Sequence, residues 1–187
     1  MLSVVIATKD SERALVQTLA CLVSGATDGF VREVIVADGG SRDETEAVAD
    51  VAGCNFVAAE GPLGRHLKQG AGLARASWLL FLRPGTILEP LWTAGAGRFV
   101  ERASPNDAAA TFRRGASAQP GFREALSMLA ASLGARPRPE QGLIISKEFY
   151  ERLGGHSELA SDPEADLLRR IGKRRLVTLA AAAETAQ

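Results

Sequence analysis

The sequence lacks an excess of charge of either sign, since 22 basic residues balance 22 acidic residues over 187 positions. A nucleic-acid-binding protein would be expected to carry a basic excess or stripe, so the composition disfavours that class. The chain also lacks a run near the ~20 apolar residues that a membrane-spanning helix needs. Its N-terminus shows no basic region followed by the apolar stretch of a signal peptide. We therefore expect a cytoplasmic protein and leave peripheral attachment to a membrane open.

Cysteine is scarce as well, and three common α/β chemistries lack their motifs. Cys21 and Cys54 have no ligand-like spacing, and Cys21 is interpreted as a buried thiol in an apolar helix. The turn over residues 7–12 contains no glycine, which disfavours a dinucleotide site, and no Gly-Lys-Ser/Thr phosphate loop occurs. Ser41 lacks the Gly-x-Ser-x-Gly elbow of a hydrolase, and two histidines give little support for a catalytic triad.

What the sequence does have is a regular alternation of buried strands and helices. Short apolar runs rich in branched residues are typical of strands that are buried on both faces. Such runs predict parallel strands over residues 2–7, 34–37, 55–58 and 78–82. Apolar residues at helical spacing separate these runs, and this order implies right-handed crossovers in an α/β fold.

The second half of the chain is less regular. The Ala-rich stretch 180–183 carries little pattern, and we expect it to fray. No linker or internal repeat divides the chain, so one domain is predicted over 1–187. The further predicted elements are strands over 108–112 and 142–146, and helices over 90–100, 122–133, 149–153 and 166–171.

Ligands of an open parallel sheet bind beyond the carboxyl ends of its strands, which directs attention to residues 8–12, 38–41 and 83–86. Asp38 is suited to accept hydrogen bonds from a base N–H or a ribose hydroxyl, and the adjacent glycines allow close approach of a ligand. Aspartate before glycine is equally common in turns that bind nothing. Position alone favours neither interpretation.

Several segments, taken in order, carry a resemblance to a known family. Residues 2–12 read LSVVIATKDSE, and residues 34–45 read VIVADGGSRDET, close to the nucleotide-binding signature VVDGGSTDGT. Residues 64–76 read GRHLKQGAGLARA and precede the strand LLFL, while EQG, LGG and EADLLRR follow later in the chain. In this order and spacing, the sequence resembles the family 2 glycosyltransferases of the GT-A fold.

The resemblance implies a mostly parallel GT-A sheet flanked by helices, with a nucleotide-binding half over 1–86 and an acceptor-side half over 87–187. It implies that the nucleotide contacts lie in the first half, with Asp38 on the base and Arg65 near the base or the diphosphate. The residues assigned to the donor in this way are Thr8, Glu12, Asp38, Gly39, Arg65, Gln69 and Arg83.

The catalytic pair implied by the resemblance is altered. The family has Glu-Asp before its last helix, with the aspartate as general base, whereas this chain has Pro163-Glu164. Glu164 then takes the position of the base, with Asp166 beside it as the second catalytic candidate. The alternative is that the acidic residues here only stabilise the N-terminus of a helix.

The metal motif implied by the resemblance is missing. Where the family has an aspartate-containing motif that holds Mg²⁺ or Mn²⁺, this chain has Arg83-Pro84-Gly85. Hard cations need oxygen ligands, so no metal ligand is assigned, and a cation would have to arrive with the diphosphate itself. Arg83 could neutralise the diphosphate instead. It could equally be a surface residue of a decayed site.

The resemblance implies an inverting glycosyltransferase that moves a sugar from a UDP- or GDP-linked donor to an acceptor hydroxyl. The second hypothesis is a catalytically inactive relative that binds a nucleotide or a protein through the same cleft. Neither hypothesis involves nucleic acid, and assembly into a homo-oligomer is left open.

Overall fold

The protein is described here by a computed structural model that covers residues 1–115 and 137–185. Within these residues, eight strands form one sheet in the order β3-β2-β1-β4-β7-β6-β8-β5. The strands are β1 (Leu2–Thr8), β2 (Val31–Asp38), β3 (Asn55–Ala58), β4 (Trp78–Leu82), β5 (Thr86–Leu88), β6 (Ala109–Arg114), β7 (Leu143–Ser146) and β8 (Leu176–Thr185). The helices are α1 (Glu12–Thr27), α2 (Thr45–Val51), α3 (Leu63–Leu73), α4 (Trp92–Arg102), α6 (Lys147–Arg152) and α7 (Pro163–Ile171), with short 3₁₀ turns η1 (Pro139–Gln141) and η2 (Lys173–Arg175).

The first four strands of this order are parallel to one another, and a helix joins each of them to the next one along the chain. β7 lies antiparallel to β4, and β6 antiparallel to β7. β8 then runs parallel to β6 and antiparallel to the short edge strand β5. The sheet is therefore mostly parallel, as the sequence predicts.

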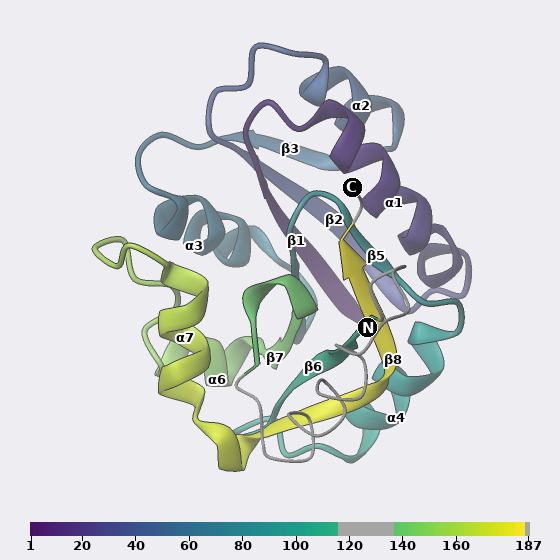
Figure 1. The fold of residues 1–187 in the computed structure, drawn as a ribbon, viewed down its shortest axis with the longest axis vertical. Coiled ribbons are helices and arrows are strands. Elements are labelled where there is room, and N and C mark those ends of the chain that lie inside the picture. The colour runs from purple at the N-terminus through teal and green to yellow at the C-terminus, as the bar shows by residue number, and fades with distance from the viewer. Residues whose placement is uncertain (116–136, 186–187) are drawn as a thin grey trace, which may run out of the picture.

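Helices cover both faces of the sheet (Figure 1), with α1 and α4 on one side and α3, α6 and α7 on the other. Side chains along β1 point alternately to the two faces of the sheet, and both sets are apolar, so helices must cover both faces. Val4 and Ile6 pack into the core beneath α1 and α4, whereas Val5 packs into the core beneath α3 and α7. All three side chains are fully buried, which explains why β1 reads as an unbroken apolar run.

The strands predicted over 2–7, 34–37, 55–58 and 78–82 are confirmed, and the second of them begins earlier, at Val31. The strands and helices predicted over the second half are also present with shifted ends, except the helix predicted over 122–133, which lies outside the described residues. None of the described helices is long and apolar enough to cross a membrane.

The expectation that the Ala-rich stretch 180–183 frays is wrong. These residues lie inside β8, where Ala182 and Ala183 are buried between the neighbouring strands β6 and β5. The sequence misses β5 as well, since a strand of three residues has too few positions to show a period. Both strands depend on hydrogen bonds to chain segments far away in the sequence.

Candidate functional site

The carboxyl ends of β1, β2 and β4 meet at one edge of the sheet, where the sequence places its candidate residues. Thr8 and Asp38 are register partners at the ends of β1 and β2. The predicted placement of Asp38 on the same edge as Thr8 is therefore confirmed. Hydrogen bonds join the loop after β1 to the loop after β2 at this edge. Asp10 of the first loop and Asp43 of the second take part in these bonds.

Asp38 forms the centre of the turn after β2. Its carboxylate accepts hydrogen bonds from Thr8 Oγ1 at 2.7 Å, from the Gly40 amide at 3.0 Å and from both the amide and the hydroxyl of Ser41 at 2.7 and 2.5 Å. Burial alone would raise the pKa of Asp38, but the hydrogen bonds from Ser41, Thr8 and Gly40 outweigh it and hold the pKa below its ordinary value. Four donors match the roughly four lone-pair positions of a carboxylate, so Asp38 holds the turn in this conformation.

The same hydrogen-bond pattern extends to the loop that leads into α1. The Asp10 amide donates to Ser41 Oγ at 2.8 Å, and Asp10 Oδ1 accepts from the Arg42 amide at 2.7 Å. Asp43 accepts from the amide of Glu12 at 3.0 Å. Asp10 has a positive φ of 47°, a conformation that aspartate tolerates better than most residues. These contacts fix the backbone of the 8–12 loop. This loop contains Thr8 and Glu12, which the resemblance predicts to contact the nucleotide-sugar donor.

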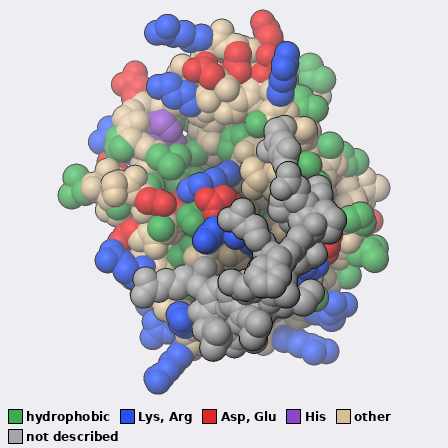
Figure 2. All heavy atoms as spheres, viewed as in Figure 1, with side chains coloured by type: hydrophobic (Ala, Val, Ile, Leu, Met, Phe, Trp, Pro, Cys, Tyr) green, Lys and Arg blue, Asp and Glu red, His purple; other side chains and the backbone are tan. Residues whose placement is uncertain are grey.

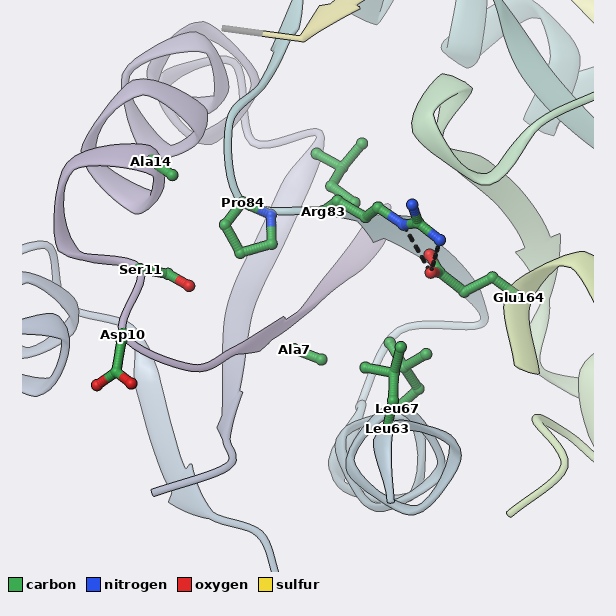
Figure 3. Close-up of a pocket in the computed structure, with 10 residues that line it drawn as sticks. Ala7, Asp10, Ser11, Ala14, Leu63, Leu67, Arg83, Pro84 and Glu164 are labelled. Carbon is green, nitrogen blue, oxygen red and sulfur yellow. Dashed lines mark hydrogen bonds and ion pairs between the residues drawn. The ribbon is translucent and has the colours of Figure 1, made fainter. Parts of the chain in front are cut away.

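A cleft of about 350 Å³ opens beside these loops, within the usual size range of small-molecule sites. Apolar and charged side chains both line it (Figure 3), and Arg83 reaches from the end of β4 toward Glu164 on α7. The lining residues are Ala7, Asp10, Ser11, Ala14, Leu63, Leu67, Leu82, Arg83, Pro84 and Glu164. Of the assigned site residues, Arg83 and Glu164 therefore line the cleft itself.

Arg83 and Glu164 form the central ion pair of the cleft. Arg83 Nε and Nη2 lie 2.7 and 2.6 Å from the same oxygen, Glu164 Oε2. Arg83 Nη1 donates to Glu140 Oε1 at 3.0 Å, and Nη2 lies 4.0 Å from Asp162. Figure 2 shows acidic and basic side chains meeting near the middle of this face of the molecule. One guanidinium thus joins the end of β4 to η1 and to the start of α7.

Glu164 is largely buried, with its side chain 11% exposed. Burial raises the pKa of this carboxyl above its ordinary range, and the charges of Asp162 and Glu140 act in the same direction. The hydrogen bonds and charge of Arg83 oppose this rise but do not cancel it. A carboxyl in a cleft with a raised pKa and a specific charged partner is a candidate for acid–base chemistry.

The remaining assigned residues lie around the cleft rather than in it. Arg65 Nε donates to Glu158 Oε2 at 2.8 Å, and both side chains are partly exposed. Gln69 donates to the Ala58 carbonyl at 3.3 Å, one turn further along α3. The Gln69 contact places this residue at the end of β3, whose Ala58 is the register partner of Asp38, whereas the Arg65 contact joins α3 to the segment between α6 and α7.

Asp166 is not brought into the cleft. Its carboxylate binds Arg169 and lies 2.8 Å from Arg170 Nε, both on its own helix. Arg170 in turn donates to the carbonyls of Leu153 and Gly155 at 2.6 and 2.7 Å. Asp166 therefore orients an arginine that ties α7 to the turn after α6. Its assigned catalytic role has no support from this placement, whereas Glu164 faces Arg83.

Gly39 is required by its neighbour His66. A Cβ on Gly39 would lie 2.6 Å from Cε1 and 3.2 Å from Nδ1 of the His66 ring, closer than real contacts allow. His66 is buried, and its Nε2 has no hydrogen-bond partner among the described residues. The ring therefore takes the space that a side chain after Asp38 would need.

The cleft does not fit a divalent cation of the kind that the resemblance implies. The guanidinium of Arg83 stands between the carboxylates that could supply oxygen ligands, and a cation there would be repelled by it. Gly85, two residues on, has φ +85°, so an aspartate at this position would be strained. Within residues 1–115 and 137–185, no three acidic, histidine or cysteine side chains are grouped closely enough to bind a metal ion.

Sequence reasoning misses two partners in this site. Glu140 lies in the matched EQG segment, but nothing in the segment shows that it binds Arg83, 57 positions earlier. Glu158, which pairs with Arg65, belongs to no matched segment at all. The sequence signal available for both glutamates is their charge. Each is an acidic residue of the second half of the chain, and the arginine that it contacts belongs to the first half.

Comparison with known proteins gives a family match, which covers the first part of the chain. The model of the family described as Glycosyl transferase family 2 matches residues 3–90, which include the loops after β1, β2 and β4. Among curated protein sequences, none matches the chain.

Solved structures of glucosyl-3-phosphoglycerate synthase from Mycobacterium tuberculosis superimpose on the whole chain at 20% sequence identity. The complex with Mn²⁺, uridine diphosphate and glucosyl-3-phosphoglycerate gives a TM-score of 0.70, with 100% of this chain and 72% of that chain covered. The complex with Mg²⁺ and uridine diphosphate gives 0.71, and the complex with Mn²⁺, UDP-glucose and phosphoglyceric acid gives 0.69, with the same coverage. At this identity the likeness establishes the fold.

Proposed function

We propose that this chain, a family 2 glycosyltransferase sequence with the GT-A fold, transfers a sugar from a nucleoside-diphosphate sugar to an acceptor hydroxyl with inversion at the anomeric carbon. The observation that carries the proposal is the buried carboxylate of Glu164 at the rim of a cleft beyond the carboxyl ends of parallel strands. Ligands of open α/β sheets bind at this edge.

The proposed reaction needs the acceptor hydroxyl, the donor sugar and the carboxylate of Glu164 close together in the cleft. Glu164 removes the proton from the acceptor hydroxyl, and the acceptor oxygen forms a bond to the anomeric carbon. The bond from that carbon to the diphosphate breaks on the opposite face, and its electron pair leaves with the diphosphate. The positive charge of Arg83 lies where it would stabilise the departing diphosphate, a task that is usually the largest electrostatic contribution.

The donor is proposed to carry uridine or guanosine. Glucosyl-3-phosphoglycerate synthase has been solved with UDP-glucose, which makes this donor the first to test. Calorimetric titration with UDP and GDP, using ADP as the comparison, decides whether the cleft binds a nucleoside diphosphate. Release of UDP from UDP-glucose in the presence of acceptors, beginning with phosphoglyceric acid, decides whether it catalyses transfer. Binding without turnover would support the inactive relative, whereas the absence of binding to either nucleotide would contradict the transferase and leave only an inactive relative that binds a protein.

Replacing Asp38 by alanine should weaken binding of a nucleoside diphosphate by roughly 1.5–3 kcal/mol, the range for a hydrogen bond to a charged group. The carboxylate already accepts four hydrogen bonds from the protein, so the base must displace one of these donors to reach it, and the variant loses both that contact and the bonds that hold the turn. Calorimetry on Asp38→Ala and on Thr8→Val, which removes one of these four bonds, separates the two contributions. Equal affinity of Asp38→Ala and the parent protein would remove Asp38 from the site.

Binding of a nucleoside diphosphate should depend little on Mg²⁺ or Mn²⁺. Arg83 already supplies a positive charge in the cleft, and the fixed guanidinium repels a second cation. A metal bound to the diphosphate in solution can still contribute weakly. Calorimetry with Mn²⁺ and with EDTA tests this expectation. A tenfold gain in affinity on adding Mn²⁺, about 1.4 kcal/mol, would contradict it.

A further inference from the structure

Among the residues that the structure describes, the cluster around Arg83 has more negative than positive groups. Three carboxylates, Glu140, Asp162 and Glu164, surround one guanidinium, and they come from two separate segments of the chain. A donor diphosphate is itself an anion, so it enters a cleft whose charged rim already carries negative charge. Charge repulsion must be relieved for the diphosphate to bind beside Glu164.

Besides this charge repulsion, Glu164 and a diphosphate would compete for the same hydrogen-bond donors of Arg83. The edge formed by Nε and Nη2 is one of the two edges through which a guanidinium holds a carboxylate or a phosphate by two parallel hydrogen bonds, and at the other edge Nη1 already donates to Glu140. In this structure both Nε and Nη2 contact Glu164 Oε2, at 2.7 and 2.6 Å. The same edge cannot hold Glu164 and a diphosphate at once, so the two anions compete for it.

We propose that Arg83 changes partners when the donor binds: the diphosphate replaces Glu164 at the Nε–Nη2 edge, and the released Glu164 takes up a proton from solvent. This inference rests on the proposed function, because it requires that the cleft bind a nucleoside-diphosphate sugar. It adds that donor binding is coupled to the protonation of the residue assigned as the base, so Glu164 must release this proton before it can accept the proton of the acceptor hydroxyl.

The groups that face Glu164 determine the direction of this coupling. Burial raises its pKa, the neighbouring Asp162 and Glu140 raise it further, and Arg83 is the group that lowers it. Asp10 also lines the cleft, but its carboxylate points away from the pair (Figure 3) and accepts from the Arg42 amide. Loss of the Arg83 contact therefore increases the proton affinity of Glu164, and the negative charge of the diphosphate acts in the same direction.

The test uses UDP-glucose without acceptor, because both of its phosphates are esterified and do not titrate near neutral pH. Calorimetry between pH 5.5 and 8, in two buffers of different ionisation enthalpy, counts the protons exchanged on binding. The expected result is net proton uptake, with affinity rising as pH falls by up to about tenfold per pH unit for one coupled proton. Binding with no proton exchange across this range would overturn the inference while leaving the proposed function intact.

Glu164→Gln provides the decisive variant. It removes the competing charge, so UDP-glucose should bind roughly tenfold tighter at pH 8, and its affinity should no longer change with pH. Glu151→Gln makes the same change of charge at an exposed position of α6 and should reproduce the pH dependence of the parent. Unchanged affinity and unchanged pH dependence in Glu164→Gln would overturn the exchange of partners. A failure of both the parent and Glu164→Gln to bind UDP-glucose or GDP-mannose would instead contradict the proposed function.

Discussion

Replacing Glu164 by glutamine should lower the rate of sugar transfer by roughly 100-fold to 10,000-fold, the usual contribution of a positioned general base. Glutamine has nearly the same shape as glutamate but cannot accept the proton of the acceptor hydroxyl. The donor still binds, because the substitution removes only a charge that competes for Arg83 and leaves every group assigned to the nucleotide in place. The measurement is kcat at saturating donor, alongside the affinity for the donor.

Two further observations separate a catalytic role of Glu164 from a structural one. Glu164→Asp keeps the charge but withdraws the carboxylate by about 1.5 Å, an error large enough to cost about 100-fold where geometry decides the rate. Transfer by the parent should rise with pH through a value above the ordinary pKa of glutamate, since the base acts deprotonated and its pKa is raised. Transfer at the parent rate by Glu164→Gln would show that another residue is the base.

Replacing Gly64 by alanine should lower the free energy of unfolding by about 3 kcal/mol or more, beyond the common range for overpacking. A Cβ at this position would lie 2.1 Å from the Ser157 carbonyl oxygen and 2.7 Å from the Ser157 carbonyl carbon. Both atoms belong to the backbone, so the loop over residues 157–158 would have to move away from α3. Because Glu158 in this loop binds Arg65, donor affinity should fall as well.

Gly72→Ala is the matched control on the same helix. A Cβ there meets no atom within 4 Å, and alanine is favoured over glycine in a helix by up to about 1 kcal/mol. Gly72→Ala should therefore leave the protein as stable as the parent or slightly more stable. Thermal and chemical unfolding of the two variants compares them directly, and equal stability of Gly64→Ala and Gly72→Ala would mean that the loop does not pack as described.

The parallel part of the sheet can be predicted from sequence because burial on both faces leaves a local record. This record is present in β1, β2 and β4, which contain runs of buried apolar residues. The edge strand β3 is only partly buried, and its place in the alternation of strands and helices identifies it instead. β8 leaves no such record, since alanine is compatible with many conformations and the strand exists through its pairing with β6 and β5. Residues 180–183 are therefore misjudged on composition alone.

Some features of the candidate site can likewise be predicted from sequence, and others cannot. Asp38 can be placed at the ligand-binding edge from sequence, because it directly follows a buried strand. Its four hydrogen bonds cannot be predicted, since they depend on the path of the turn and on Thr8, 30 positions earlier. The pairing of Arg83 with Glu164 spans 81 positions and leaves no local pattern. Residues so far apart in the sequence come into contact only through the tertiary fold.

The contact between Gly39 and His66 limits the order in which these two positions can change during evolution. A side chain at 39 collides with the imidazole ring, so it can be introduced only after position 66 has become smaller. The reverse order is open, because a smaller residue at 66 leaves a space beside Gly39. The two substitutions are thus epistatic, and lineages that carry a side chain after the aspartate of this turn should have lost the histidine first.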